Sequence, residues 1–385
     1  MIVTVVAQMV VYGLRPLLSY EALVLDASPA GLGLLTASFS VLSLAAAIPL
    51  GRAVDRWGER PFLVGGPAVM TAVSLSLLTP QWITSLVVLS ALLGLGHMGT
   101  SVGVQTLIAR TEDGALRERR ISIFTIVNSA GQMLAPAAAG LLAGDIASAH
   151  AATSFSGSRA FAAASVIAVV GLVSGAGLGR FPRSRGGREA GRAARPQGGF
   201  LAVMRVRSMP NALLASFTVL SSIDLLSAYL PAYGAARGLS VRTIGLLLAV
   251  QGAASLLARV GMLRLIRLLT RRRLLSLSMG LSAAGLAVLP LVGRLPGLCL
   301  LMVVIGFGLG LGQPITLGWV AGHAPDGLKG TAMSVRLSGN RLGQTLVPMA
   351  VGALAGSAGL AAAFVSPAVL LATAGFFVFR SRLRE

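Results

Sequence analysis

The sequence predicts an all-α integral membrane protein, in which twelve transmembrane helices form two pseudo-symmetric six-helix bundles. Three observations support this fold class. The mean hydropathy is +0.82 with only 11% charged residues, apolar runs of membrane-crossing length recur along the chain, and the two halves share an internal repeat. A hydrocarbon core about 30 Å thick takes roughly 20 helical residues to cross. The 385 residues therefore leave room for about twelve crossings with short connections.

Charged residues, or Pro and Gly, separate the apolar runs from one another. The runs lie at residues 2–25, 31–50, 61–79, 83–108, 120–144, 158–179, 209–233, 241–263, 274–292, 297–320, 331–355 and 359–380. The first run has no positively charged stretch before it and no evident cleavage site after it. We therefore expect it to remain as the first helix and not to be removed as a signal peptide.

The net charge of +20 comes from 32 Lys and Arg against 12 Asp and Glu. On an alternating topology, 24 of the basic residues fall in loops on one side and four on the other. The positive-inside rule then predicts a cytoplasmic (inner) membrane protein with both termini in the cytoplasm. This distribution indicates contact with anionic lipid headgroups and not with nucleic acid. The four remaining basic residues, inside the runs or at their ends, are Arg15, Arg259, Arg336 and Arg341.

The longest polar stretch, residues 181–208, is rich in Gly and Arg and cannot build a core. It predicts a cytoplasmic linker between an N-terminal bundle at 1–180 and a C-terminal bundle at 209–385. The shift that superposes Ser122 on Ser334 matches 11 of the 23 positions at 122–144 with their counterparts in the second half. Duplicated halves around a central site are typical of transporters.

A short segment between the second and third runs reads Gly-Arg-Ala-Val-Asp-Arg-Trp-Gly-Glu-Arg-Pro, at residues 51–61. We expect it to form a cytoplasmic loop. It resembles the loop signature of the major facilitator superfamily, and together with the twelve runs and the repeat this resemblance covers essentially the whole chain. The resemblance implies a conformational latch made of Gly51, Asp55, Arg56, Gly58 and Arg60. The alternative is a generic basic turn.

The resemblance also implies a function, which is secondary active transport of a small organic molecule by alternating access. Residues 131–140 resemble a degenerate form of the fifth-span motif of proton-linked antiporters in this superfamily, which favours proton-coupled efflux. Import or facilitated diffusion of a metabolite is the alternative within transport. Outside transport, the alternative is a membrane-embedded lipid-processing enzyme. It is disfavoured because the acids are isolated and the histidines far apart. We expect a monomeric transporter and not an enzyme.

Three of the ionisable residues inside the apolar runs are candidates for a function. Asp224 is the only carboxylate well inside one, where an ionised acid costs about 2.5 to 3.5 kcal/mol unless it faces water or a partner. It is either a proton carrier, exposed to two compartments in turn, or a fixed partner of a polar group. His97 either shuttles protons or forms a simple hydrogen bond. Arg15 either pairs with Asp224, holds an anionic part of the substrate or bonds between helices.

Two pairs of amide side chains are spaced four residues apart, and in each half a proline follows after another four residues. Asn128 and Gln132 in the first half, and Asn340 and Gln344 in the second, each lie at an interval of four on one helix face. They either line the midline between the halves or bond across packed helices. The residues predicted to line a substrate cavity are Arg15, Asn128, Gln132, Tyr229, Gln251, Gln313, Asn340 and Gln344.

The composition argues against cofactors and metal ions. Cys299 is the single cysteine, and His97, His150 and His323 lack ligand-type spacing. The glycine-rich stretch at 94–99 lies inside an apolar run without a preceding strand, so it is not a nucleotide site. The expected partners are a small-molecule substrate, protons and membrane lipids.

Overall fold

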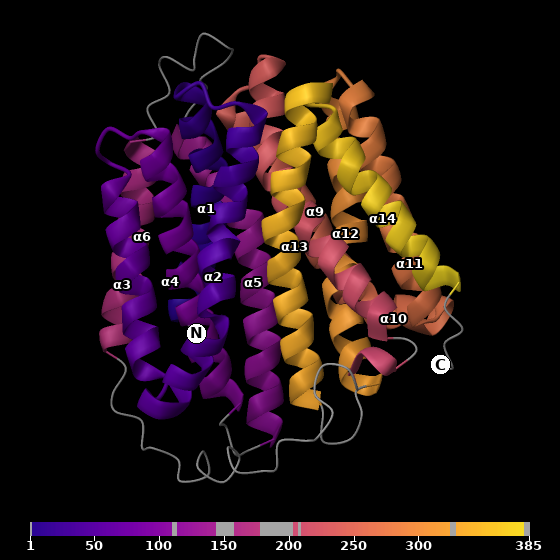
Figure 1. Ribbon diagram of the computed structural model, residues 1–385, viewed down its shortest axis with the longest axis horizontal. Coiled ribbons are helices and arrows are strands. Elements are labelled where there is room, and N and C mark those ends of the chain that lie inside the picture. The colour runs from indigo at the N-terminus through magenta and orange to yellow at the C-terminus, as the bar shows by residue number, and fades with distance from the viewer. Residues whose placement is uncertain are drawn as a thin grey trace. The chain divides into compact units, whose positions relative to one another are not determined.

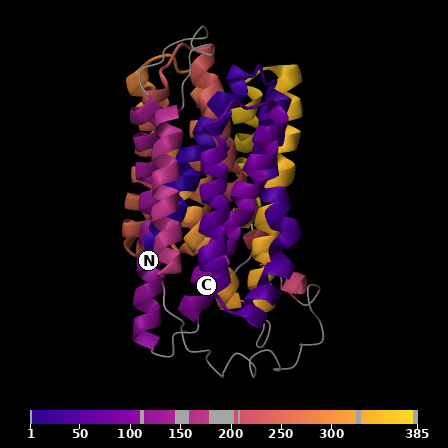
Figure 2. The ribbon, with the colours of Figure 1, turned by 90° about the vertical axis from the view of Figure 1, so that its left-hand side faces the viewer.

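The computed structural model describes residues 2–109, 114–143, 158–177, 203–206, 209–323 and 329–380, and these residues contain helices but no strand. Long helices dominate both views (Figures 1 and 2). They are α1 (Ile2–Val24), α2 (Pro29–Trp57), α3 (Arg60–Ser76), α4 (Ile83–Ala109), α5 (Gly114–Ala143), α6 (Ser158–Ala176), α9 (Met209–Ala236), α10 (Val241–Leu269), α11 (Arg271–Val288), α12 (Leu295–His323), α13 (Lys329–Ala358) and α14 (Ala362–Arg380).

Ten helices in the described part of the chain are long and apolar enough to cross a membrane. The other two long helices are α3, with only 17 residues, and α13, which carries Arg336, Asn340, Arg341 and Gln344. The prediction of an all-α, multi-pass membrane protein is therefore confirmed. The number of crossings stays a prediction.

The helices begin and end close to the predicted runs, with three extensions. Helix α2 continues to Trp57, α5 begins at Gly114, and α10 continues to Leu269. The prediction of a loop from residue 51 was therefore wrong for residues 51–57. Hydropathy detects the part of a helix that crosses hydrocarbon, whereas Arg and Lys continue a helix well in water. The turn comes instead at Gly58, whose φ of 84° suits glycine.

The chain divides into two compact units. The first unit comprises Met1–Ala27, Ser38–Arg195 and Gly234–Leu246, and the second comprises Ser28–Ala37, Pro196–Tyr233 and Leu247–Glu385. Within the first, α1 packs against α4, α5 and α6, and α3 packs against α4 and α6. Within the second, α11 packs against α12 and α14. Helix α13 also contacts α12 and α14. The predicted linker at 181–208 lies outside the described residues except for 203–206.

The internal repeat extends to the contacts between helices. A methyl group added at Gly94 on α4 would overlap the backbone carbonyl oxygen of Phe39 on α2. The repeat pairs Gly94 with Gly306 on α12, where an added methyl group would overlap the carbonyl oxygen of Gln251 on α10. The same shift pairs Phe39 with Gln251. Each unit therefore packs these two helices backbone to backbone at matching positions, as small residues allow in membrane proteins. The pseudo-symmetric fold is confirmed.

Candidate proton and substrate site

A cluster of polar side chains lies within the second unit, on three helices. Its members are Asp224 on α9, Gln313 and Thr316 on α12, and Arg336, Asn340, Arg341 and Gln344 on α13. Four-residue spacing places three of the α13 residues along one helix face. Buried polar groups in a membrane helix are expensive and mark functional sites by default. This cluster is therefore the first candidate for the chemistry of the protein.

Asp224 and Gln344 form the centre of this cluster. The Asp224 side chain is only 2% exposed, and its Oδ2 accepts a hydrogen bond of 2.7 Å from Nε2 of Gln344. The other end of the same amide, Oε1, accepts a bond of 3.2 Å from Nη1 of Arg341. A carboxylate can only accept and a guanidinium can only donate, so these two partners fix the orientation of the amide. The result is a hydrogen-bonded chain from Arg341 through Gln344 to Asp224.

Arg336 lies about two helical turns before Gln344 on α13 and is 6% exposed. Its Nη2 donates to the side-chain oxygen of Gln313 at 2.7 Å and to the backbone oxygen of the same residue at 3.2 Å. A weaker contact of 3.4 Å reaches Oγ1 of Thr316. The Nε of Arg336 is buried without a hydrogen-bond partner among the described residues, and so is the amide oxygen of Asn340. Gln313 also donates through Nε2 to the backbone oxygen of Ser216 at 3.1 Å.

Arg336 and Arg341 are functional candidates that sequence reasoning missed. Both counted only as basic residues that fitted neither face of the membrane. A usable signal was present, because Arg336 precedes Asn340 and Gln344 at intervals of four and so shares their helix face. Extending the four-residue spacing of Gln344 and Asn340 by another four residues toward the N-terminus identifies Arg336.

The first unit carries the counterpart of the central pair. Nε2 of Gln132 on α5 donates to the hydroxyl of Tyr12 on α1 at 2.7 Å. The repeat pairs Gln132 with Gln344 and Tyr12 with Asp224. The same amide contact therefore recurs with a neutral phenol in place of the carboxyl group. At the position that matches Arg336 the first half has Phe124. The carboxyl and guanidinium groups at these paired positions thus belong to the second half of the repeat.

Arg15 and His97 lie in the first unit, and both are close to the ring of Phe39. The guanidinium carbon of Arg15 is 4.7 Å from the centroid of the Phe39 ring, within cation–π range. The centroids of Phe39 and His97 are 6.0 Å apart. This aromatic ring brings the two residues together, although the sequence predicted no link between them. An ion pair of Arg15 with Asp224 stays a prediction, because the two residues belong to different units.

The other predicted cavity residues have diverse surroundings. Tyr229 is fully buried, and its hydroxyl donates to the backbone oxygen of Pro29 at 2.9 Å within the second unit. Gln251 is buried on α10 against Gly306, whereas Asn128 on α5 is half-buried. The structure does not bring these three residues to the Asp224 cluster by any hydrogen bond that it describes. Their role in a cavity stays a prediction.

A sequence profile for the Major Facilitator Superfamily matches residues 1–269 and 212–385. The chain belongs to the Major Facilitator Superfamily. Solved structures of transporters agree in fold. A mutant of the nucleoside transporter NupG superposes with a TM-score of 0.78 at 14% identity, covering 98% of both chains. The inward-open xylose transporter XylE from E. coli gives 0.75 at 15% identity, covering 100% of this chain and 95% of that one. No curated protein matches the sequence significantly.

Membership of the Major Facilitator Superfamily makes this chain a multi-pass membrane protein of a transporter fold. Family and fold indicate a transporter of small molecules rather than an enzyme. A solved POT family transporter, in complex with a thioalcohol-conjugated peptide, has the same fold, with a TM-score of 0.76 at 14% identity over 98% of this chain and 94% of that one. These low identities show the fold alone. The substrate must therefore be argued from this chain's own residues.

The predicted latch of this superfamily member lies where α2 ends and α3 begins. The amide of Gly58 donates to the backbone oxygen of Val54 at 2.8 Å, and α3 starts at Arg60 with Pro61 in its first turn. Arg56 and Arg60 are exposed. The surroundings of Gly51 and the Asp55 side chain lie outside the described part of the structure. The latch role of these residues stays a prediction.

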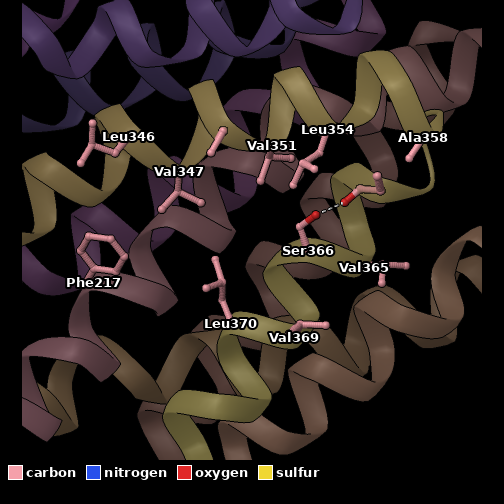
Figure 3. Close-up of a pocket in the computed structure, with 12 residues that line it drawn as sticks. Phe217, Leu346, Val347, Val351, Leu354, Ala358, Val365, Ser366, Val369 and Leu370 are labelled. Atoms are coloured by element: carbon pink, nitrogen blue, oxygen red, sulfur yellow. Dashed lines mark hydrogen bonds between the residues drawn. The ribbon is translucent and has the colours of Figure 1, made fainter.

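An apolar groove of about 600 Å³ runs between α9, α13 and α14 (Figure 3). Phe217, Val347 and Leu370 line it, and Ser366 adds a hydroxyl that bonds back to Ala362 of its own helix at 2.7 Å. Several of its side chains are well exposed, among them Leu346 and Val369 at 52% and 59%. Such a surface suits contact with lipid chains and offers no polar recognition. The polar cluster remains the candidate for substrate and proton chemistry.

Proposed function

We propose that this protein is a secondary active transporter that exports a small organic molecule across the cytoplasmic membrane by alternating access. Inward movement of protons drives the export, and Asp224 carries the proton. The observation that carries the proposal is the hydrogen bond between Gln344 and a carboxyl group that is 2% exposed at mid-helix. Intramembrane acids of this kind mark proton pathways in transporters.

The Asp224 carboxyl group and the Gln344 amide together can act as a two-state element. When Asp224 is ionised, it accepts the bond from Gln344. When it takes up a proton, it becomes a donor and the carboxylate charge is neutralised. Gln344 also accepts a bond from Arg341, so a change at Asp224 alters the balance of this chain of three side chains. A proton can shift a conformational equilibrium only through such a differential interaction.

The available driving force is sufficient for export. Moving one charge across 100 mV releases about 2.3 kcal/mol, which supports a substrate gradient of roughly fifty-fold. The direction of transport is proposed from α5, where the sequence at 131–140 resembles the proton-linked antiporter motif. Within the first unit, Pro136 and Gly140 of this segment pack against Gly245, so close that a methyl group there would overlap the Pro136 carbonyl oxygen.

The proposed orientation places both chain termini in the cytoplasm. It rests on the distribution of charge, with 24 of the 32 basic residues on the side that we assign to the cytoplasm. Exposed Arg56 and Arg60 at the α2–α3 turn would then meet anionic headgroups or take part in a latch. The two roles are compatible, since a latch between helices forms at the same depth as the headgroups.

A panel of labelled organic compounds tests the proposal in cells with and without the protein, before and after a protonophore collapses the proton gradient. We expect at least one compound to accumulate less in cells that carry the protein, and this difference to vanish with the gradient. Increased accumulation that depends on the gradient would identify an importer instead. A difference that persists without the gradient would refute proton coupling.

A further inference from the structure

Arg336 on α13 is a buried cation whose described hydrogen bonds all go to neutral oxygen atoms. These oxygens belong to Gln313 and Thr316, and only one of the three guanidinium nitrogens, Nη2, makes the bonds. A charge removed from water is expensive unless it is paired with an opposite charge. The Arg336 side chain is well removed from water, since the residue is only 6% exposed. The site therefore lacks an anion to offset this charge among the described residues.

The Arg336 Nε atom is a buried donor that remains unused. It is buried and has no hydrogen-bond partner within the described chain. One turn further along the same face, Asn340 is 4% exposed, and its amide oxygen also has no partner there. Residues four apart on a helix are neighbours, with about 5 to 6 Å between their Cβ atoms. Two unsatisfied, buried polar groups thus lie within reach of one small ligand.

We propose that Arg336 and Asn340 bind the carboxylate of the transported molecule, which is a singly charged organic acid. The Nε–H of Arg336 donates to one carboxylate oxygen. No described bond fixes the Asn340 amide, so it can turn its NH₂ group to the other oxygen. This inference rests on the proposed function only in that the bound molecule is the one transported.

The charge at the site favours a carboxylate over a phosphate group. Arg336 supplies one positive charge and a buried donor, Nε, that no described residue uses. A single negative charge offsets this cation, whereas a doubly charged phosphate would leave excess charge in a poorly solvated site. The apolar side chains that dominate α12 suit an acid with a hydrophobic body.

The site is separate from the proton carrier along the helix. Arg336 and Gln344 are eight positions apart, or about 12 Å at roughly 1.5 Å per residue. Asp224 bonds to Gln344 and not to Arg336. The two sites can therefore be altered one at a time, and we expect Asp224→Asn to retain carboxylate binding.

Equilibrium binding to the purified full-length protein in lipid nanodiscs tests the inference. The probes are labelled benzoate, phenylacetate and octanoate, each compared with its neutral amide. We expect at least one acid to bind about ten-fold or more tightly than its amide. The variant Arg336→Met should lose this preference, and Arg336→Lys and Asn340→Ala should weaken binding of the acid about ten- to hundred-fold, as the loss of a charged hydrogen bond does. The matched control in the first half, Phe124→Met at the position that the repeat pairs with Arg336, should bind like the parent.

Three results would overturn the inference. The first is that no acid binds more tightly than its amide. The second is that Arg336→Met keeps the preference. The third is a clear fall in the melting temperature of Arg336→Met, which would indicate a structural role. We expect no fall, because a buried charge without an opposite charge beside it is costly, and Arg336→Met removes that cost. Loss of binding in Arg336→Met together with unchanged uphill transport in Asp224→Asn would refute the proton carrier and leave the anion site standing.

Discussion

The amide of Gln344 donates a hydrogen bond of 2.7 Å to the carboxylate of Asp224. In the other half of the repeat, Gln132 donates a bond of the same length to the hydroxyl of Tyr12. The two pairs occupy matching positions of the repeat. One contact of the repeat thus joins an amide to a phenol in the first half and an amide to a carboxyl group in the second.

The two pairs should differ in their contribution to stability. Gln344→Ala leaves a carboxyl group that is 2% exposed without its amide donor, which costs about 2 to 3 kcal/mol for a charged group. Gln132→Ala removes a neutral bond from Tyr12, which is only half-buried, at about 1 kcal/mol. Thermal unfolding of both variants in the same detergent measures the difference. Equal melting temperatures would contradict the assignment of Gln344 as the donor to the buried Asp224 carboxyl group.

The close backbone contacts of the repeat make a second prediction. Gly94→Ala and Gly306→Ala each place a methyl group against a carbonyl oxygen of the neighbouring helix. Because backbone gives way less than a side chain, we expect each change to cost about 1 to 3 kcal/mol. Gly318→Ala, on the same helix as Gly306 with no atom within 4 Å, is the control and should unfold like the parent. Folded yield by size-exclusion chromatography and melting temperature report the result. A parent-like Gly306→Ala would show that α10 and α12 do not pack as described.

The proposed topology is accessible to labelling, because the parent has one cysteine. On a Cys299→Ala background, Arg294→Cys should react with a membrane-impermeant maleimide in intact cells. Trp57→Cys, at an exposed position where α2 ends, should react only after the membrane is permeabilised. These outcomes follow from the excess of basic residues around Trp57. The reverse labelling pattern would show that the protein has the opposite orientation in the membrane.

Hydropathy alone predicted the positions of the helices well, and failed where a helix leaves the membrane. Arg52 to Trp57 belong to α2 although they end the apolar run, because charge does not terminate a helix in water. The repeat predicted equivalent packing in both halves, and the glycine contacts confirmed it at the atomic level.

The sequence could place Asp224 and Gln344 at similar positions along their helices, but it could not predict their bond. Each lies about 22 Å along its helix, counted from Met209 or Lys329. The rotation of each helix about its axis and the choice of neighbour depend on packing across the whole unit. Arg336 was missed for a related reason, since a lone arginine in an apolar run has no partner that the sequence can name. Its bonds to α12 exist only once α12 and α13 are packed together.

The most direct measurement of the central claim is uphill transport by Asp224→Asn in proteoliposomes with an imposed proton gradient. The amide keeps the size of the carboxyl group and a hydrogen-bond acceptor for Gln344, but it cannot take up a proton. Tyr12→Phe, at the matching position of the first half, is the control. The account predicts that Asp224→Asn loses accumulation against the gradient while exchange of substrate across the membrane continues, and that Tyr12→Phe keeps both. Accumulation by Asp224→Asn equal to that of the parent would contradict it.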